Sequence, residues 1–212
     1  MASSINEGRS TDRTTAAIFE AFHVKSSVQK NFSAQYYMLG AMEESTEVLE
    51  AVRDFKSKGA GATADDAIAV VKEVGDVLWY CTGLCRANGI ELASIVGEDF
   101  VRADAIASSS TEAEHEVALV LQIGHLAGRL KKYERGDYDT TQLQQYFDTL
   151  LPGVFGSLAG VCRTHGGVAL ADAAAANITK INKRLAQNTI HGDGSNREGT
   201  HVAQKRSAES LE

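Results

Sequence analysis

Polar residues gather at the two ends of this chain, and apolar stretches fill the part between them. The central part holds six or seven apolar stretches separated by polar or glycine-containing segments, which is typical of packed helices. Residues 1–13 and 192–212 are polar, and we expect both to be mobile tails. The pattern predicts an all-α fold. The approximate helical spans are 14–26, 33–57, 64–87, 91–107, 112–134, 141–165 and 168–187.

Several helix-end signals support these spans. Residues 63–66, Thr-Ala-Asp-Asp, resemble a helix N-cap followed by acidic residues in the first turn. Residues 111–114, Thr-Glu-Ala-Glu, resemble a capping box. The serines at 108–110 are the best candidate for a linker about halfway along the chain. Glycines expected at helix C-termini are Gly59, Gly61, Gly89 and Gly136.

Four acidic residues form two pairs beside or inside the apolar stretches 36–41 and 70–85. The members of each pair, Glu44 with Glu47 and Glu73 with Asp76, are three residues apart. Residues at this spacing share one face of a helix, so two helices can direct both pairs toward one centre. Buried carboxylates are costly unless they are neutralised. A hard cation such as Mg²⁺, which prefers oxygen ligands, would neutralise them.

A solvated helix face is the alternative for the first pair, because Glu50 extends the acidic run and could pair with Arg53 three residues later. The second pair has less room for water, since valine, leucine and aromatic residues surround Glu73 and Asp76. Gly75 lies in mid-helix, where glycine costs about 1 kcal/mol relative to alanine. Close packing against a neighbouring helix would explain it.

Composition narrows the class of protein. The chain has 212 residues, 43% of them hydrophobic, and a single proline, Pro152, which suits a compact helical protein. The net charge of −7 provides no general field that would attract nucleic acid or an anionic membrane. No stretch approaches the roughly 18 apolar residues of a membrane span, and no signal-peptide pattern begins the sequence. We therefore expect a cytoplasmic protein without nucleic-acid or membrane partners.

The two halves of the chain resemble each other at nearly constant offsets. Residues 85–90, Cys-Arg-Ala-Asn-Gly-Ile, correspond to 162–166, Cys-Arg-Thr-His-Gly, at an offset of 77. Residues 52–55 correspond to 130–133 at an offset of 78. These matches predict two fused helical-bundle repeats, 14–107 and 108–191, that pack as a pseudo-dimer. At the same offsets the four acids are replaced by Gln122, His125, Leu150 and Gly153, so the second repeat is expected to lack a metal cluster.

The acidic motifs resemble those of a known superfamily. Residues 36–47 contain Glu-Glu-x-x-Glu, and residues 73–80 contain Glu-x-x-Asp followed by an apolar run. In this order they are similar to the all-α nucleoside triphosphate pyrophosphohydrolases, which include MazG proteins, dCTP pyrophosphatases and dimeric dUTPases. Residues 177–184 and 192–197 resemble the closing helix and tail of that superfamily. The resemblance covers about residues 33–197 and implies two MazG-like repeats, the second of them degenerate.

The resemblance implies roles for individual residues. Glu44, Glu47, Glu73 and Asp76 would be ligands of Mg²⁺, with Mn²⁺ as the alternative ion. Glu43 would take a proton from the attacking water or hold a supporting position. The substrate-binding residues would be Tyr80, facing the nucleotide, Lys180 and Arg184, contacting the phosphates, and Asn177, supporting those two.

The implied reaction converts a nucleoside triphosphate and water into the monophosphate and pyrophosphate, for cleaning of the nucleotide pool. A catalytically silent MazG-like binding or scaffold protein is one alternative, and a uracil-specific dUTPase-like enzyme is another. A homodimer is also left open. The aromatic residues Phe22, Phe32, Tyr36, Tyr37 and Trp79 could stack on a nucleobase, although such spacing is more typical of a core.

Overall fold

The computed structural model describes residues 14–27, 32–111, 114–187 and 189, and in these residues the protein is helical without strands. The helices are α1 (Ala16–Ser26), α2 (Ala34–Lys58), α3 (Ala64–Ala87), α4 (Leu92–Val96), α5 (Val101–Ser109), α6 (His115–Glu134), α7 (Thr140–Val161) and α8 (Leu170–Ala186). A 3-10 turn, η1 (Gly59–Gly61), follows α2, and a π-helical turn, η2 (Cys162–Gly166), follows α7. The prediction of an all-α fold is confirmed. The tails predicted at 1–13 and 192–212 lie outside the described residues.

Local sequence explains where several helices begin and end. Thr63 accepts a hydrogen bond from the backbone N–H of Asp66, whose carboxylate accepts one from the backbone N–H of Thr63 at 2.8 Å, so a capping box starts α3. Gly59, Gly89 and Gly136 follow helix ends with positive φ angles of 49°, 71° and 85°. Glycine tolerates this left-handed region best, so these predicted helix ends are confirmed.

The prediction of one helix over 91–107 is wrong, because the structure divides this stretch into α4 and α5. Gly97 has a φ of 78° and Phe100 a φ of 61°, and neither angle continues a right-handed helix. The side chain of Phe100 is fully buried, which offsets the cost of its left-handed backbone. The spacing of apolar residues continues across the break, because both short helices direct residues into the same core. The apolar pattern therefore gave no sign of the break.

The start of α6 also differs from the prediction. Glu114 is the N-cap residue of α6, without a side-chain capping bond, and Thr111 lies outside the helix. The capping box predicted at 111–114 is therefore wrong, and residues 112 and 113 lie outside the described residues. The serines at 108–110 do not form an extended linker, because Ser108 and Ser109 still belong to α5.

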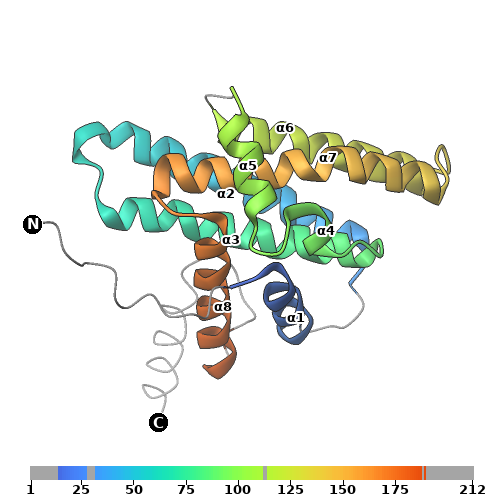
Figure 1. Cartoon of the computed structure of the whole chain (residues 1–212), viewed down its shortest axis with the longest axis horizontal. Helices are drawn as coiled ribbons and strands as arrows, with labels where there is room; N and C mark the ends of the chain where they lie inside the picture. The colour runs from blue at the N-terminus through green and yellow to red at the C-terminus, as the bar shows by residue number, and fades with distance from the viewer. Residues whose placement is uncertain (1–13, 28–31, 112–113, 188, 190–212) are drawn as a thin grey trace, which may run out of the picture.

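Two long helical pairs form the body of the protein (Figure 1). Helices α2 and α3 pack against each other, as do α6 and α7, and the pairs meet through contacts of α2 with α6 and α3 with α7. Helix α5 packs on α7, whereas α8 packs on α3 and projects away from the two pairs (Figure 1). Helix α1 contacts α8, α4 and α3. In the described part of the chain, no helix combines the length and apolar character needed to cross a bilayer.

The buried positions of the two pairs coincide at the offsets found in the sequence. At 78 residues the buried matches between α2 and α6 are Ala41 with Leu119, Val48 with Leu126 and Val52 with Leu130. At 77 residues the matches between α3 and α7 with the following η2 include Val74 with Leu151, Leu78 with Phe155, Cys81 with Leu158 and Cys85 with Cys162. Fused repeats would give this pattern. The pseudo-dimer and its boundary between 107 and 108 stay predictions.

Gly75 allows α8 to approach α3 closely. A Cβ atom at Gly75 would lie 2.9 Å from the Cβ of Asn177 and 3.2 Å from the carbonyl oxygen of Ala173. Such distances leave no room for a methyl group without movement of α8. Gly75 immediately precedes Asp76, so the same contact determines which side chains of α8 reach the acidic pairs.

This packing predicts opposite effects for two Gly→Ala substitutions in helices. Gly75→Ala should lower the free energy of unfolding by about 1–3 kcal/mol, because overpacking against α8 outweighs a gain of about 1 kcal/mol in helix propensity. Gly128→Ala in α6, where a Cβ atom would meet nothing within 4 Å, should raise it by about 0.5–1 kcal/mol. Urea denaturation of both variants measures the difference. Equal stability of the two variants would contradict the close α3–α8 contact.

Candidate functional site

Three acidic side chains converge where α2 packs against α3. Glu44 and Glu47 come from α2 and Glu73 from α3, and one carboxylate oxygen of each lies within 4.8 Å of the others. All three side chains are half-buried. Among the described residues, this is the one group of three or more histidine, cysteine or acidic side chains that could hold a metal ion. The i, i+3 spacing on α2 therefore acts as expected, placing both glutamates on the face toward α3.

The environment of this group favours the protonated carboxyl over the carboxylate. Burial, followed by the charges of Asp76, Glu47 and Glu73, raises the pKa of Glu44 from 4.5 to about 8. Burial and the charge of Asp76 raise the pKa of Glu73 from 4.5 to about 6. The pKa of Glu47 is also raised, first by burial and then by Glu43. A cation among these oxygens would reverse the effect, because it favours the charged form of each ligand.

Asp76, the fourth predicted ligand, faces α8 instead of joining the group of three. Its Oδ1 accepts a hydrogen bond of 2.8 Å from Nδ2 of Asn177, and its Oδ2 forms an ion pair with Lys180. Asn177 is 2% exposed, and the side chains of Asp76 and Lys180 are largely shielded, at 17% and 19%. Residues about 100 positions apart in sequence thus meet at one site. Lys180 supplies a positive charge where the acidic residues accumulate.

The other predicted site residues lie around this centre. The ring of Tyr80 packs over Gly40, where an added Cβ atom would lie 2.1 Å from the ring. The centroid of the Tyr80 ring is 6.0 Å from that of the Tyr36 ring. Burial, then Tyr36, raises the pKa of Tyr80. Glu43 is exposed and lies outside the group of three. Arg184, half-buried, lies one turn beyond Lys180 on α8.

A buried polar cluster beside Tyr80 was not predicted. His23 of α1 is fully buried, and its ring centroid lies 4.5 Å from that of Trp79. Trp79 donates a hydrogen bond of 2.9 Å from Nε1 to the hydroxyl of Ser26. Burial, then the charge of Arg86, lowers the pKa of His23 from 6.5 to about 4, so its imidazole is neutral at physiological pH. The sequence contains one signal for this cluster, since the polar residues His23 and Ser26 fall on the apolar face of α1.

The second half has a neutral arrangement at the corresponding positions. Gln122 accepts a hydrogen bond of 3.2 Å from the hydroxyl of Ser157. Its amide nitrogen would lie 3.0 Å from a Cβ atom at Gly153, so Gln122 covers the place where an aspartate side chain would begin. His125 is exposed, and Leu150 is half-buried. The structure therefore gathers acids in the first half and fills the equivalent space in the second half with an amide.

One segment of the chain matches a family of known proteins. Residues 32–99 match the family model described as MazG nucleotide pyrophosphohydrolase domain. The match contains α2, α3 and α4, and with them the group formed by Glu44, Glu47 and Glu73. Asn177 and Lys180 lie beyond the matched residues. Searches of curated proteins and of solved structures found no match to the chain.

Charge repulsion in this group predicts a pH-dependent stability of the metal-free protein. The pKa of Glu44 rises from its ordinary value of 4.5 to about 8 in the folded protein, so between these two pH values the folded state binds more protons than the unfolded state. The free energy of unfolding should therefore fall as pH rises through this range. At pH of about 8 in a chelator, Glu44→Gln should raise Tm by roughly 2–4 °C relative to the unaltered protein.

The matched control is Asp54→Asn, which neutralises an exposed acid of the same helix outside the group. Its Tm should follow that of the unaltered protein at every pH. Thermal unfolding at acidic and mildly alkaline pH gives the comparison. If Glu44→Gln and Asp54→Asn behave alike at high pH, the carboxylates do not repel one another as described.

Proposed function

We propose that the chain is a Mg²⁺-dependent nucleoside triphosphate pyrophosphohydrolase, because residues 32–99 match the model of the MazG nucleotide pyrophosphohydrolase domain. Water would attack the α-phosphorus, the bond from the α-phosphorus to the bridging oxygen would break, and pyrophosphate would leave. The monophosphate is the other product. The observation that carries the proposal is the convergence of Glu44, Glu47 and Glu73 within the matched segment.

The donor set suits the proposed cation. The three carboxylates provide oxygen ligands within 4.8 Å of one another, and oxygen is the donor that Mg²⁺ and Mn²⁺ prefer. Burial and then the neighbouring acids raise their pKa values, and Lys180 is the cation that lowers the pKa of Glu44. When bound, Mg²⁺ would supply Lewis-acid polarisation of the phosphoryl group. Asp76 would complete the ligand set if its ion pair with Lys180 opened.

Lys180 links the metal site to the proposed phosphate site. In the structure its ammonium group pairs with Asp76. If Asp76 served as a ligand of a bound Mg²⁺, the ammonium group of Lys180 would be free to contact the negatively charged phosphates, which Lys binds as a point charge. Asn177 would keep Asp76 oriented through its hydrogen bond, and Arg184, one turn along α8, would extend the positive surface.

Two further residues take roles near the scissile bond. Glu43 is exposed beside Glu44 and close enough to raise the pKa of Glu47, so it is the proposed acceptor of the proton from the attacking water. Tyr80 would face the nucleotide from α3, where Gly40 leaves room for its ring. The proposed biological role is removal of unwanted nucleotides from the pool. A cytoplasmic location and a homodimer remain predictions from the sequence.

One observation favours a second candidate, a catalytically silent binding protein. Lys180 already neutralises Asp76, so an internal ammonium group could replace the metal ion permanently. Such a protein would retain the fold and bind ligands without turnover. A uracil-specific enzyme of the dUTPase kind is a narrower version of the first candidate. A panel of nucleotides separates the three.

We predict release of pyrophosphate from at least one ribo- or deoxyribonucleoside triphosphate in the presence of Mg²⁺. Glu73→Gln should reduce this turnover by about 100-fold or more, because loss of a ligand costs at least as much as loss of a supporting partner. Asp54→Asn should leave it unchanged. Pyrophosphate release, with circular dichroism to verify folding, is the measurement. Absence of pyrophosphate release across the panel would support the silent protein, and unchanged turnover in Glu73→Gln would remove that residue from the site.

A further inference from the structure

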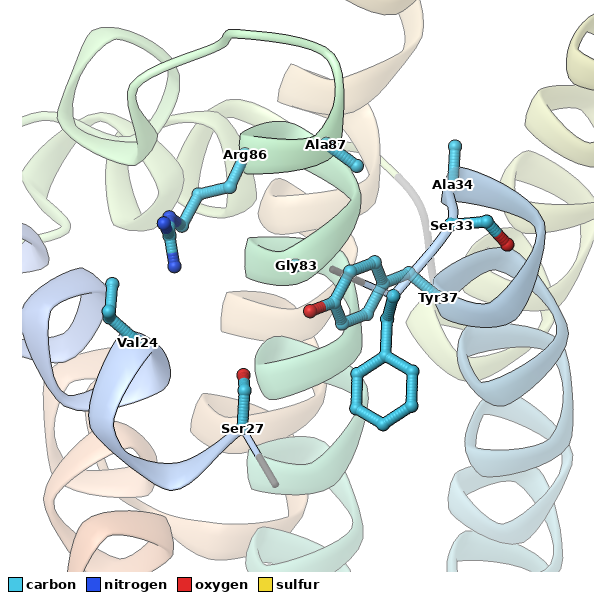
Figure 2. Close-up of a pocket in the computed structure, with 9 residues that line it drawn as sticks. Val24, Ser27, Ser33, Ala34, Tyr37, Gly83, Arg86 and Ala87 are labelled. Carbon is cyan, nitrogen blue, oxygen red and sulfur yellow. The ribbon is translucent and has the colours of Figure 1, made fainter. Parts of the chain in front are cut away.

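A pocket of about 530 Å³ lies between the end of α1, which is outside the matched segment, and the start of α2 and the end of α3, which are inside it (Figure 2). Its size falls within the roughly 300–1,000 Å³ of small-molecule sites. Residues that line it include Ser27, Phe32, Tyr37, Gly83 and Arg86. None of these residues belongs to the acidic group, so the pocket is a separate part of the surface.

The pocket lies on the same helical faces as the acidic group. On α3, Asp76, Tyr80 and Gly83 are spaced by four and three residues, and on α2 Glu44, Gly40 and Tyr37 are spaced in the same way. Such residues share a face. Seven residues of helix separate the pocket from the acids on both helices, which corresponds to about 10 Å. Such a spacing suits a nucleotide whose α-phosphate lies beside the acids and whose base lies in the pocket.

Aromatic rings connect the two places. Tyr80 packs over Gly40, and Tyr37 packs over Gly83, where an added Cβ atom would lie 2.1 Å from the ring. Phe32 and Tyr36 stack with centroids 3.9 Å apart at an interplanar angle of 10°. Flat aromatic faces suit a nucleobase, since stacking accepts any base. Selection among bases must then come from hydrogen-bonding groups in the pocket.

The hydrogen-bonding groups of the pocket come from three helices. Figure 2 shows the guanidinium of Arg86 and the hydroxyls of Tyr37 and Ser27 directed toward the space between α1, α2 and α3. Two residues of α1 hold the guanidinium of Arg86. Its Nη1 lies 3.4 Å from Nδ1 of His23, and its Nε lies 4.0 Å from a carboxylate oxygen of Glu20.

The neutral imidazole of His23 accepts from Arg86 at Nδ1, because a guanidinium can only donate. The contact therefore fixes the orientation of the guanidinium and uses one of its five N–H donors. The Nε–H faces the carboxylate of Glu20, so the donors left for a ligand with acceptor atoms are the remaining ones on Nη1 and Nη2. Arginine offers no acceptor atom, so at this point the pocket favours a ligand group that accepts a hydrogen bond over one that donates.

We propose that this pocket holds the nucleobase and that Arg86 selects keto bases, namely guanine, hypoxanthine, uracil and thymine, over adenine and cytosine. A keto oxygen, with N7 in the purines, accepts from the guanidinium fork, as guanine does from arginine in other settings. The amino group of adenine or cytosine at the same place would face a donor and leave both groups without a partner. The inference rests on the proposed function and adds the substrate class.

The test compares matched nucleotides in the unaltered protein and in two variants of Arg86. The kcat/KM ratios of dGTP to dATP and of dUTP to dCTP should both be about 10 or more, within the range that one arginine–base pair provides. Arg86→Met should bring both ratios close to one. Arg86→Gln should shift the purine ratio toward adenine, because an amide both donates and accepts and can pair with that base.

Arg53→Met is the matched control, since Arg53 is an exposed arginine of α2 outside the pocket. It should keep both ratios of the unaltered protein. A gain of activity toward dATP in Arg86→Gln cannot result from misfolding, so this variant remains informative even if Arg86→Met is unstable. Ratios near one in the unaltered protein, or ratios that are the same in all variants, would overturn the assignment of Arg86.

Calorimetric binding of dGMP, dAMP, dUMP and dCMP separates this inference from the proposed function. A keto preference in binding that disappears in Arg86→Met, without any pyrophosphate release, would support the base pocket and reject the enzyme. Pyrophosphate release without a keto preference would reject the base pocket and support the enzyme. Failure of both measurements would reject both.

Discussion

Electrostatic repulsion among carboxylates that two helices hold together is the constraint on which the rest of the site depends. The packing of α2 on α3 keeps oxygens of Glu44, Glu47 and Glu73 within 4.8 Å in a half-buried place. Burial and the neighbouring acids raise the pKa of Glu44 and Glu73, and the ammonium group of Lys180 acts against this rise. The proposed cation would remove this electrostatic cost, because it favours the charged form of each carboxylate.

Helix α8 supplies what the matched segment lacks. Gly75 lets α8 approach α3 so closely that Asn177 and Lys180 both reach Asp76. The segment of 32–99 contributes the acids, and a helix more than 70 residues beyond it contributes the positive charge. The proposed base pocket extends the same surface along α2 and α3, with Arg86 as its donor. One face of the α2–α3 pair thus carries the acidic group with Lys180 beside it, and Arg86 lies further along α3.

Much of this could be predicted from the sequence, because its signals are local. Residues three apart share a helix face, so the gathering of Glu44, Glu47 and Glu73 followed from spacing. The close packing at Gly75 followed from the cost of a glycine in mid-helix. The break at Gly97 could not be predicted, since the apolar pattern continues through it. The approach of Lys180 to Asp76 depends on how α8 docks. Arg86 and His23 belong to no motif, and only the tertiary structure brings them together.

The most direct test of the central claim is the position of a cation in the folded protein. Crystals soaked with Mn²⁺ and measured by anomalous diffraction should show a peak in contact with carboxylate oxygens of Glu44, Glu47 and Glu73, with Lys180 displaced from Asp76. A peak elsewhere, or three carboxylates turned to solvent around no ion, would contradict the account.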